Sequence, residues 1–270
     1  MPSSVRHLVL PAAGFGTRMR VVDPGLPKEL LPLGGTTVLG LAVREAELAG
    51  IQDVTVVIRQ GKEVLREYLE GLDTPCSFSF VYQQEQLGEC DAIACARDLV
   101  GEADFAVLYP DNVSASGPGA LKTLLDCWEQ VRVATQIDNR AEPLTDMVAI
   151  SRTREDHLET LGNAGRINLE RLDHGTWSIL DFLPKGEGHF RQRYPHEWRA
   201  NGLYVTGPHF FEMIDQVRRE GYSGELTDGK VRRAILASGR IMRGCPLAGE
   251  MLDAGNPAGY GLLQKRLSSG

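Results

Sequence analysis

The sequence predicts an α/β protein: a Rossmann-like, mostly parallel mixed sheet flanked by helices, with a small β-rich extension. In the first half of the chain, short apolar runs typical of strands alternate with amphipathic patterns typical of helices, which indicates βαβ units. In the second half, strand-like runs follow one another with turns between them, and helical patterns return only afterwards. The two patterns together favour one α/β core that continues into a β-rich part.

The first half is expected to alternate from its first element onward. Residues 5–10 predict a strand, which leads into a glycine-rich turn. Residues 54–58 form a continuous β-branched run, as is typical of a strand buried on both faces. The other expected elements are helices at 37–49, 64–69, 92–99 and 121–130 and strands at 78–82 and 105–109.

The second half is expected to be richer in strands. Residues 174–176 predict a hairpin turn, and Thr227 is a candidate helix cap. The expected strands are 147–151, 167–172, 177–182 and 203–206, and the expected helices are 208–219, 227–238 and 259–267.

Composition and charge disfavour several classes of protein. The formal net charge is −7, which argues against non-specific nucleic-acid binding, because such binding needs a broad basic surface. No apolar run reaches the ~18 residues of a membrane span, and the N-terminal segment is a poor signal peptide. The five cysteines include no Cys-x-x-Cys pair, so we expect reduced thiols in a cytoplasmic protein and no zinc cluster.

A glycine-rich turn follows the first expected strand, and it consists of Ala12, Ala13, Gly14, Phe15, Gly16, Thr17 and Arg18. Glycines at such a turn let backbone N–H groups approach phosphate oxygens closely. The turn is not a Walker A loop, because no Gly-Lys-Ser/Thr follows. Met19 also makes it a poor dinucleotide fingerprint, which disfavours an oxidoreductase. Without a ligand, the same glycines would only form a tight strand-to-helix turn.

A second motif, Pro27-Lys28-Glu29-Leu30-Leu31-Pro32-Leu33, follows a short distance downstream. Its lysine lies between two prolines, and Arg18 and Lys28 could converge on one triphosphate. The alternative is that both are solvated surface cations, which is the commonest fate of Lys and Arg.

The two motifs, at this spacing, resemble the sugar-1-phosphate nucleotidyltransferase family, and the pattern is most similar to the bacterial UTP–glucose-1-phosphate uridylyltransferases. Three later segments fit in the family's order: Gln-Gln-Glu-Gln-Leu-Gly at 83–88, Tyr-Pro-Asp-Asn at 109–112 and Leu-Asp-Ala-Gly-Asn-Pro at 252–257. The resemblance runs from about residue 5 to residue 260, and no linker-like stretch interrupts it. It implies one nucleotidyltransferase domain over 1–270, with a nucleotide-binding half (1–135) and an acceptor-binding half (136–270).

The resemblance also implies a role for each motif. Arg18 and Lys28 would be catalytic cations. Asp111 and Asp253 would hold Mg²⁺, which usually takes one or two carboxylates plus phosphate oxygens; alone, each could be an ordinary turn residue. Gln83 would recognise a pyrimidine edge, with a glycine at position 88 letting the base lie against the backbone. The full set of expected nucleotide-binding residues is Ala12, Ala13, Gly14, Gly16, Thr17, Gln83 and Gly88.

The implied reaction joins a nucleoside monophosphate to a phosphorylated small molecule and releases pyrophosphate. UTP and glucose 1-phosphate are the favoured substrates. One alternative is dTTP, CTP or GTP with an unusual phosphate or phosphonate acceptor, and another is a non-catalytic relative that binds nucleotide and regulates a partner. Relatives usually form dimers or tetramers, so we expect a homodimer or homotetramer.

The sequence departs from the family in the acceptor half. Where the family carries Glu-Lys-Pro, this chain has Phe182-Leu183-Pro184, and neither Phe nor Leu can bind a sugar hydroxyl or a phosphate. Lys185 is therefore the nearest candidate for the acceptor cation, and Asn201 and Gly202 are further acceptor contacts by resemblance. The basic and aromatic residues of 189–199 are expected to form a solvated loop or a subunit contact and, as the alternative, to contact an acidic acceptor.

Overall fold

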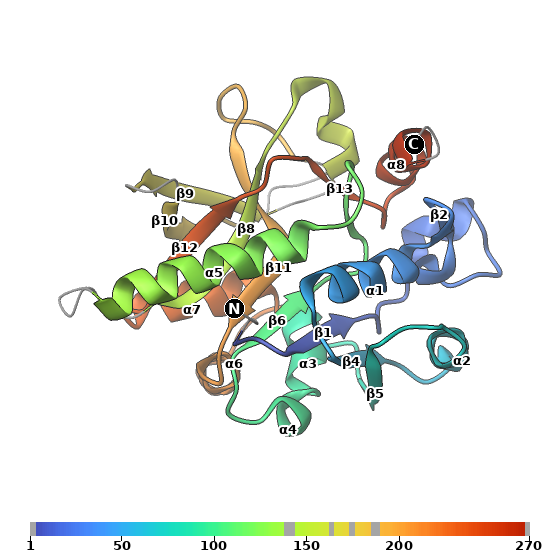
Figure 1. Cartoon of the computed structure of the whole chain (residues 1–270), viewed down its shortest axis with the longest axis horizontal. Coiled ribbons are helices and arrows are strands. Elements are labelled where there is room, and N and C mark those ends of the chain that lie inside the picture. Colours follow the sequence, from blue (N-terminus) through green and yellow to red (C-terminus); the bar gives the residue numbers. More distant parts are fainter. Residues whose placement is uncertain (1–3, 138–143, 162–164, 173–175, 185–189, 268–270) are drawn as a thin grey trace.

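The computed structural model describes residues 4–137, 144–161, 165–172, 176–184 and 190–267. Its centre is a nine-stranded sheet with the strand order β5-β4-β1-β6-β11-β8-β12-β10-β9 (Figure 1). Strands from both halves of the chain belong to this sheet, so the predicted β-rich extension continues the α/β part directly. The mixed α/β fold class is confirmed.

The first half supplies four parallel strands: β1 (His7–Pro11), β4 (Asp53–Ile58), β5 (Ser77–Tyr82) and β6 (Phe105–Leu108). β1 pairs with β4 on one side and with β6 on the other. The chain therefore reverses its direction of winding between β1 and β6. Open α/β sheets bind ligands at such a switch point, outside the carboxyl ends of the strands.

The second half joins the sheet at β6. Strand β11 (Trp198–Thr206) runs antiparallel to both β6 and β8 (Leu144–Arg152). The sheet then continues through β12 (Ile241–Pro246), β10 (Trp177–Phe182) and β9 (Gly165–Arg171). Because β9 pairs with β11 as well as with β10, this end of the sheet curls back on itself.

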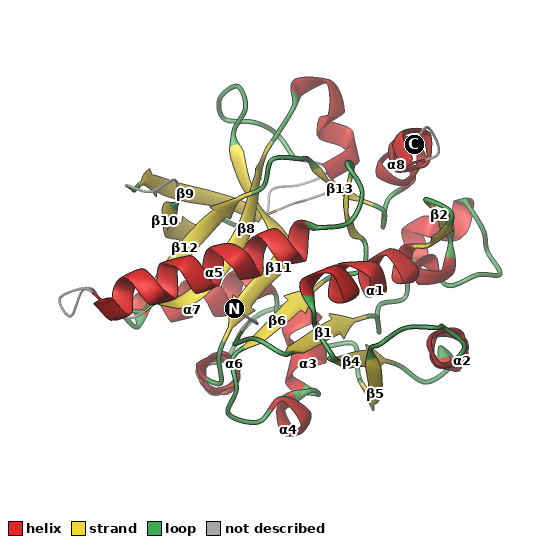
Figure 2. Ribbon diagram, in the orientation of Figure 1, coloured by secondary structure: helices red, strands yellow, loops and turns green. Residues whose placement is uncertain are grey.

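Helices cover both faces of the sheet, as Figure 2 shows. Apolar residues of α1 (Val38–Ala49), α2 (Glu63–Glu70) and α5 (Ala120–Ile137) pack on one face, and α1 and α5 lie side by side there. The other face carries α3 (Glu89–Ala94), α6 (His209–Glu220) and α7 (Asp228–Ala237), and α4 (Arg97–Val100) follows α3 directly.

A third apolar cluster lies beside the sheet and supports the C-terminal part of the site. It joins η1 (Thr17–Val21), β2 (Pro32–Leu33), β7 (Asn112–Ser114), β13 (Met251–Asp253) and α8 (Pro257–Leu267). The short elements β3 (Thr36–Thr37), η2 (Lys28–Leu30) and η3 (Glu155–Leu161) complete the described secondary structure.

Most expected elements occur within a few residues of their predicted bounds, and the exceptions have physical reasons. The helix expected at 92–99 is two short helices, α3 and α4, that meet at Cys95 and Ala96. Strand β12 was not predicted, because Gly244 and Pro246 interrupt its apolar run. Thr227 stands at the N-cap of α7, but its side chain makes no capping hydrogen bond. β9 and β10 form the expected hairpin, although 173–175 of its turn lie outside the described residues.

Two further expectations concern the cysteines and the membrane. All five cysteines are free thiols in the structure. Among the described helices, none combines the length and the apolar character that crossing a membrane requires.

Candidate active site

A cavity of about 810 Å³ opens at the carboxyl ends of β1 and β6. Its size is within the range typical of small-molecule sites. Its walls come from both halves of the chain: the glycine-rich loop and Lys28, the 83–92 segment, Asp111 with Asp253, and a set from the acceptor half that includes Phe182, Arg199, Asn201 and Arg232.

The glycine-rich loop forms one wall, and most of its predicted residues line the cavity. Ala13, Gly14, Gly16 and Thr17 face it, and no described residue accepts a hydrogen bond from the backbone N–H of Gly14 or Gly16. These N–H groups are therefore free for phosphate oxygens.

Ala12 is the exception in this loop, and its predicted contact with nucleotide is not supported. Its N–H donates to the carbonyl of Val57, 2.8 Å away, which extends the pairing of β1 with β4. Its carbonyl accepts from Lys62 Nζ at 2.8 Å. Both backbone groups are thus used behind the loop, away from the cavity.

Lys62 was not singled out from the sequence, and it joins the two N-terminal motifs. Its ammonium group donates to the Ala12 carbonyl and to Glu29 Oε2, each at 2.8 Å. Lys62 is 3% exposed and Glu29 is 2% exposed. A fully buried ion pair of this kind fixes the glycine-rich loop to the segment that carries Lys28.

The two predicted metal aspartates meet at the centre of the cavity. Asp111 follows β6, and the antiparallel pairing of β7 with β13 places Asp253 opposite Asn112. A Cβ atom on Gly255 would lie 2.6 Å from Asp111 Oδ2 and 2.8 Å from Asp253 Oδ1. Both carboxylates therefore converge on the same side of Gly255.

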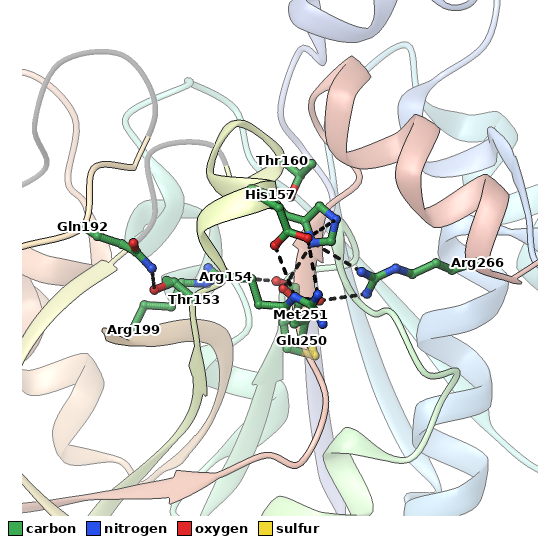
Figure 3. Close-up of polar contacts among 10 residues, drawn as sticks. Thr153, Arg154, His157, Thr160, Gln192, Arg199, Glu250, Met251 and Arg266 are labelled. Carbon is green, nitrogen blue, oxygen red and sulfur yellow. Dashed lines mark hydrogen bonds and ion pairs between the residues drawn. The ribbon is translucent and has the colours of Figure 1, made fainter. Parts of the chain in front are cut away.

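Strand β13 is held in place by a polar cluster behind the site (Figure 3). Glu250, which precedes β13, accepts from Arg266 Nη1 at 2.8 Å and lies 3.7 Å from His157 Nδ1. Arg199 donates from Nη2 to the carbonyl of Met251. Contacts on both sides of the strand thus fix the position of Asp253.

Each predicted catalytic cation lies against one of the two carboxylates. Lys28 Nζ pairs with Asp111 Oδ2, and Arg18 Nη1 lies 3.5 Å from Asp253 Oδ2. The Arg18 side chain is 59% exposed, whereas Lys28 is largely enclosed. The two cations therefore lie between the glycine-rich loop and the carboxylates.

These pairs set the charges at the centre. Burial would raise the pKa of Asp111, but the Lys28 ammonium outweighs it and keeps that pKa low. Burial and the neighbouring charge of Asp111 raise the pKa of Asp253. Burial would lower the pKa of Lys28, yet the carboxylates of Asp111 and Glu29 raise it, so the ammonium stays charged.

The donor set fits a hard divalent cation. Two carboxylates that converge on one point repel each other, and Mg²⁺ binds through one or two carboxylates together with phosphate oxygens and waters. No cluster of three or more His, Cys, Asp or Glu side chains with metal-binding geometry occurs among the described residues. A pair of carboxylates leaves positions on such a cation for phosphate oxygens and waters.

The predicted base-recognition residue Gln83 is buried and already partly engaged. Its Nε2 donates to the Gly88 carbonyl at 3.1 Å and to Asp91 Oδ2 at 2.9 Å, and its Oε1 accepts from Gln86 at 3.2 Å. Because Asp91 and the carbonyl can only accept, the amide oxygen must point the other way. That oxygen keeps one lone pair for a ligand.

The structure shows a packing reason for a glycine at position 88, besides the predicted contact with a base. Its φ is +118°, and a Cβ atom there would lie 2.6 Å from the backbone nitrogen of Leu226. A side chain at this position would therefore collide with the loop before α7. Gly88 still lines the cavity, so its backbone faces any ligand bound there.

The residues of the acceptor half form another wall of the cavity, called the acceptor wall below. Asn201 and Gly202 are part of it, as predicted. Asn201 Oδ1 accepts from Ser151, while its Nδ2 has no partner among the described residues. A Cβ atom on Gly202 would lie 2.4 Å from the Tyr109 ring, so packing against Tyr109 requires this glycine. Phe182 and Leu183 line the wall, and Lys185 lies outside the described residues.

Two buried arginines line the same wall: Arg199, from the stretch for which an acceptor contact was the alternative prediction, and Arg232, which the sequence did not single out. Arg191, Arg193, Tyr194 and His196 are exposed, as expected for their stretch, but Arg199 is 3% exposed. The prediction of a solvated stretch is wrong at Arg199 because the residue lies within β11, facing the cavity. Arg232 of α7 is 1% exposed.

The fold and the site are those of a nucleotidyltransferase: a glycine-rich loop, two cations and two carboxylates surround one cavity at a sheet switch point. The model of the MobA-like NTP transferase domain matches residues 8–180, and the chain belongs to this family.

Curated relatives and solved structures agree with this assignment. A UTP–glucose-1-phosphate uridylyltransferase of Pseudomonas aeruginosa is 27% identical, over 95% of this chain and 93% of the relative. A UDP-glucose pyrophosphorylase solved with UDP-glucose has a TM-score of 0.77 at 24% identity and 98% coverage of each chain. The inositol-1-phosphate CTP transferase of T. maritima has a TM-score of 0.70 at 15% identity, covering 100% of this chain and 99% of its own. At these identities the structural likenesses concern the fold.

Proposed function

We propose that the protein transfers UMP from UTP to a hexose 1-phosphate, with glucose 1-phosphate as the first acceptor to test. An acceptor phosphate oxygen attacks the α-phosphorus in line, the bond from that phosphorus to the bridging oxygen breaks, and pyrophosphate leaves. The observation that carries the proposal is the convergence of Asp111 and Asp253 beside Lys28, between the phosphate loop and the acceptor wall.

The proposed substrates rest on the relatives and on one feature of the site. The P. aeruginosa relative is named for UTP and glucose 1-phosphate. The free lone pair of Gln83 Oε1 suits the N3–H donor of uracil or thymine, whereas cytosine presents an acceptor at N3. Asp91 holds the amide in that orientation.

In this proposal Asp111 and Asp253 hold Mg²⁺, which neutralises phosphate charge when it is bound. Lys28 and Arg18 then turn from these carboxylates to the phosphate oxygens. The N–H groups of the glycine-rich loop hold the triphosphate in place for in-line attack. No covalent enzyme intermediate is required, so the chain contributes position and charge stabilisation.

A pyrophosphate-release assay tests the proposal directly. UTP, dTTP, CTP and GTP are each offered with glucose 1-phosphate and with a panel of other phosphorylated acceptors, in Mg²⁺ and in EDTA. We expect release that depends on Mg²⁺ and is fastest with UTP. Release with CTP or GTP alone would overturn the assignment of the base, and no release with any pair would favour a non-catalytic nucleotide-binding protein.

A further inference from the structure

Arg199 is a buried cation without an acidic partner in contact. Its Nη2 donates to the Met251 carbonyl, and Nε has no hydrogen-bond partner in the described structure. Burial lowers the pKa of Arg199 to about 10 against the attraction of Asp253 and Glu250, so the guanidinium is still charged near neutral pH. Burying a charge without compensation is costly, and this one lines a cavity next to the metal carboxylates.

Arg232 presents a second set of unused donors on the same wall. Its Nε donates to Asp228 Oδ1 at 2.9 Å, while Nη1 and Nη2 have no partner among the residues that the structure describes. The guanidinium carbon lies 3.8 Å from the centre of the Tyr204 ring and 5.2 Å from that of Phe182. The rings lie near the guanidinium and Asp228 binds its Nε, so the buried Nη1 and Nη2 of this cavity-lining residue are left without an acceptor.

The outer edge of an arginine matches a carboxylate or a phosphate, which it binds through two parallel hydrogen bonds. Cation–π contacts orient the group without using its N–H donors. Buried donors that lack an acceptor cost free energy. A ligand with an anionic group at this edge would remove that cost, and a neutral hydroxyl would satisfy only part of it.

We propose that the acceptor carries a second acidic group besides its phosphate, and that Arg199 binds the phosphate while Arg232 binds the second group. The inference rests on the proposed function and narrows its acceptor to an acidic sugar phosphate. Arg199 is assigned to the phosphate because it adjoins the strand that carries Asp253. Arg232 lies at the Phe182 end of the wall.

The spacing of the two arginines is compatible with one small ligand. Arg199 and Tyr204, on which Arg232 stacks, are five residues apart on β11, and the strand between them spans at most ~17 Å. A register shift in the pairing of β11 with β8 lies between Ala200 and Tyr204. Both arginines line the same cavity.

Acidic side chains also face this wall and limit what it accepts. Asp228 pairs with Arg232, and Glu89 and Glu225 line the cavity on the same side. Arg232 therefore has unpaired N–H donors, but nearby carboxylates offset its positive charge. We expect this wall to bind one acidic group at a defined position and not to attract anions in general.

The test compares three acceptors by calorimetric titration and by pyrophosphate release: glucose 1-phosphate, glucuronic acid 1-phosphate and glucose 1,6-bisphosphate. We expect at least one of the two acidic compounds to bind about tenfold or more tightly than glucose 1-phosphate. Arg232→Met should abolish that preference, and Arg199→Met should weaken all three. Arg233→Met, an exposed neighbour on α7, is the matched control and should retain the preference.

Each outcome decides the inference separately from the proposed function. Equal binding of all three acceptors, a preference that survives Arg232→Met, or no measurable binding of any acceptor would overturn it. If Arg232→Met does not fold, Arg232→Lys is the substitute. It keeps the positive charge but cannot form two parallel hydrogen bonds, so it should lose most of the preference for the acidic acceptors. An acid preference in calorimetry without any pyrophosphate release would support the subsite and reject the transferase assignment. Pyrophosphate release at equal rates with all three acceptors would support the transferase assignment and reject the subsite.

Discussion

The ammonium group of Lys28 is paired with the carboxylate of Asp111, and this pair joins η2 to the segment that follows β6. The pair keeps both groups charged. In the proposed reaction, Asp111 would give up this lysine and bind Mg²⁺ together with the nucleotide.

Loss of either carboxylate should therefore remove activity without unfolding the chain. We expect Asp111→Asn and Asp253→Asn to reduce the rate of pyrophosphate release by orders of magnitude while the thermal unfolding transition is kept, because both groups face the cavity. Asp98→Asn, on the exposed surface of α4, is the control. Activity of either site variant close to that of the control would contradict the metal assignment.

Lys28→Ala should lower the turnover number by about a hundredfold or more, because one well-placed donor to a developing charge has that effect. The same change leaves Asp111 buried without its cation. Steady-state kinetics at saturating Mg²⁺ and UTP would measure it. A normal turnover number with a raised KM would instead place Lys28 in ground-state binding.

The Lys62–Glu29 pair should behave as a unit. We expect Lys62→Met alone to lower the free energy of unfolding by about 3 kcal/mol, because it leaves a buried carboxylate unpaired. Lys62→Met with Glu29→Gln should recover part of that loss. Urea unfolding of the four proteins in a double-mutant cycle measures the coupling. Additive losses would show that the two side chains do not interact in solution.

Asp91 should influence the choice of base without touching it. Its carboxylate fixes the orientation of the Gln83 amide, and Asp91→Asn allows the amide to turn over. We expect this variant to narrow the preference for UTP over CTP while Asp98→Asn leaves it unchanged. Competition between the two nucleotides in one assay measures the ratio. An unchanged ratio would mean that Gln83 is held by other contacts.

Gly88→Ala should lower the free energy of unfolding by about 1–3 kcal/mol, because the new methyl group meets the backbone of Leu226. Gly261→Ala is the comparison: it lies in α8, and a Cβ atom there has nothing within 4 Å. Thermal or urea unfolding would show a loss for the first and none for the second. Equal stabilities would mean that the 88–92 segment adjusts freely.

The sequence was most informative where chemistry is local. The alternation of strand and helix patterns predicted the parallel half, because buried parallel strands are continuous apolar runs. The residues of the glycine-rich turn and of the Pro-Lys-Glu segment were singled out from the sequence, and most of them line the cavity. Asp111 and Asp253 were paired by motif order, and the β7–β13 contact that brings them together was not itself predicted.

The sequence was least informative where burial decides the role of a residue. Arginines are mostly exposed, so nothing local marked Arg199 and Arg232 as buried. The same holds for Lys62, whose partners come from two distant segments. The packing of Gly88 could not be predicted either, because Leu226, whose backbone leaves no room for a side chain there, is distant in the sequence.

The late position of β13 in the chain has a consequence for biosynthesis. A nascent chain that has been synthesised through β7 already contains the glycine-rich loop, Lys28 and Asp111. Asp253 joins this centre only when β13 pairs with β7, after all the other described strands have been synthesised. We therefore expect a chain truncated before β13 to lack the second carboxylate of the centre and to be inactive.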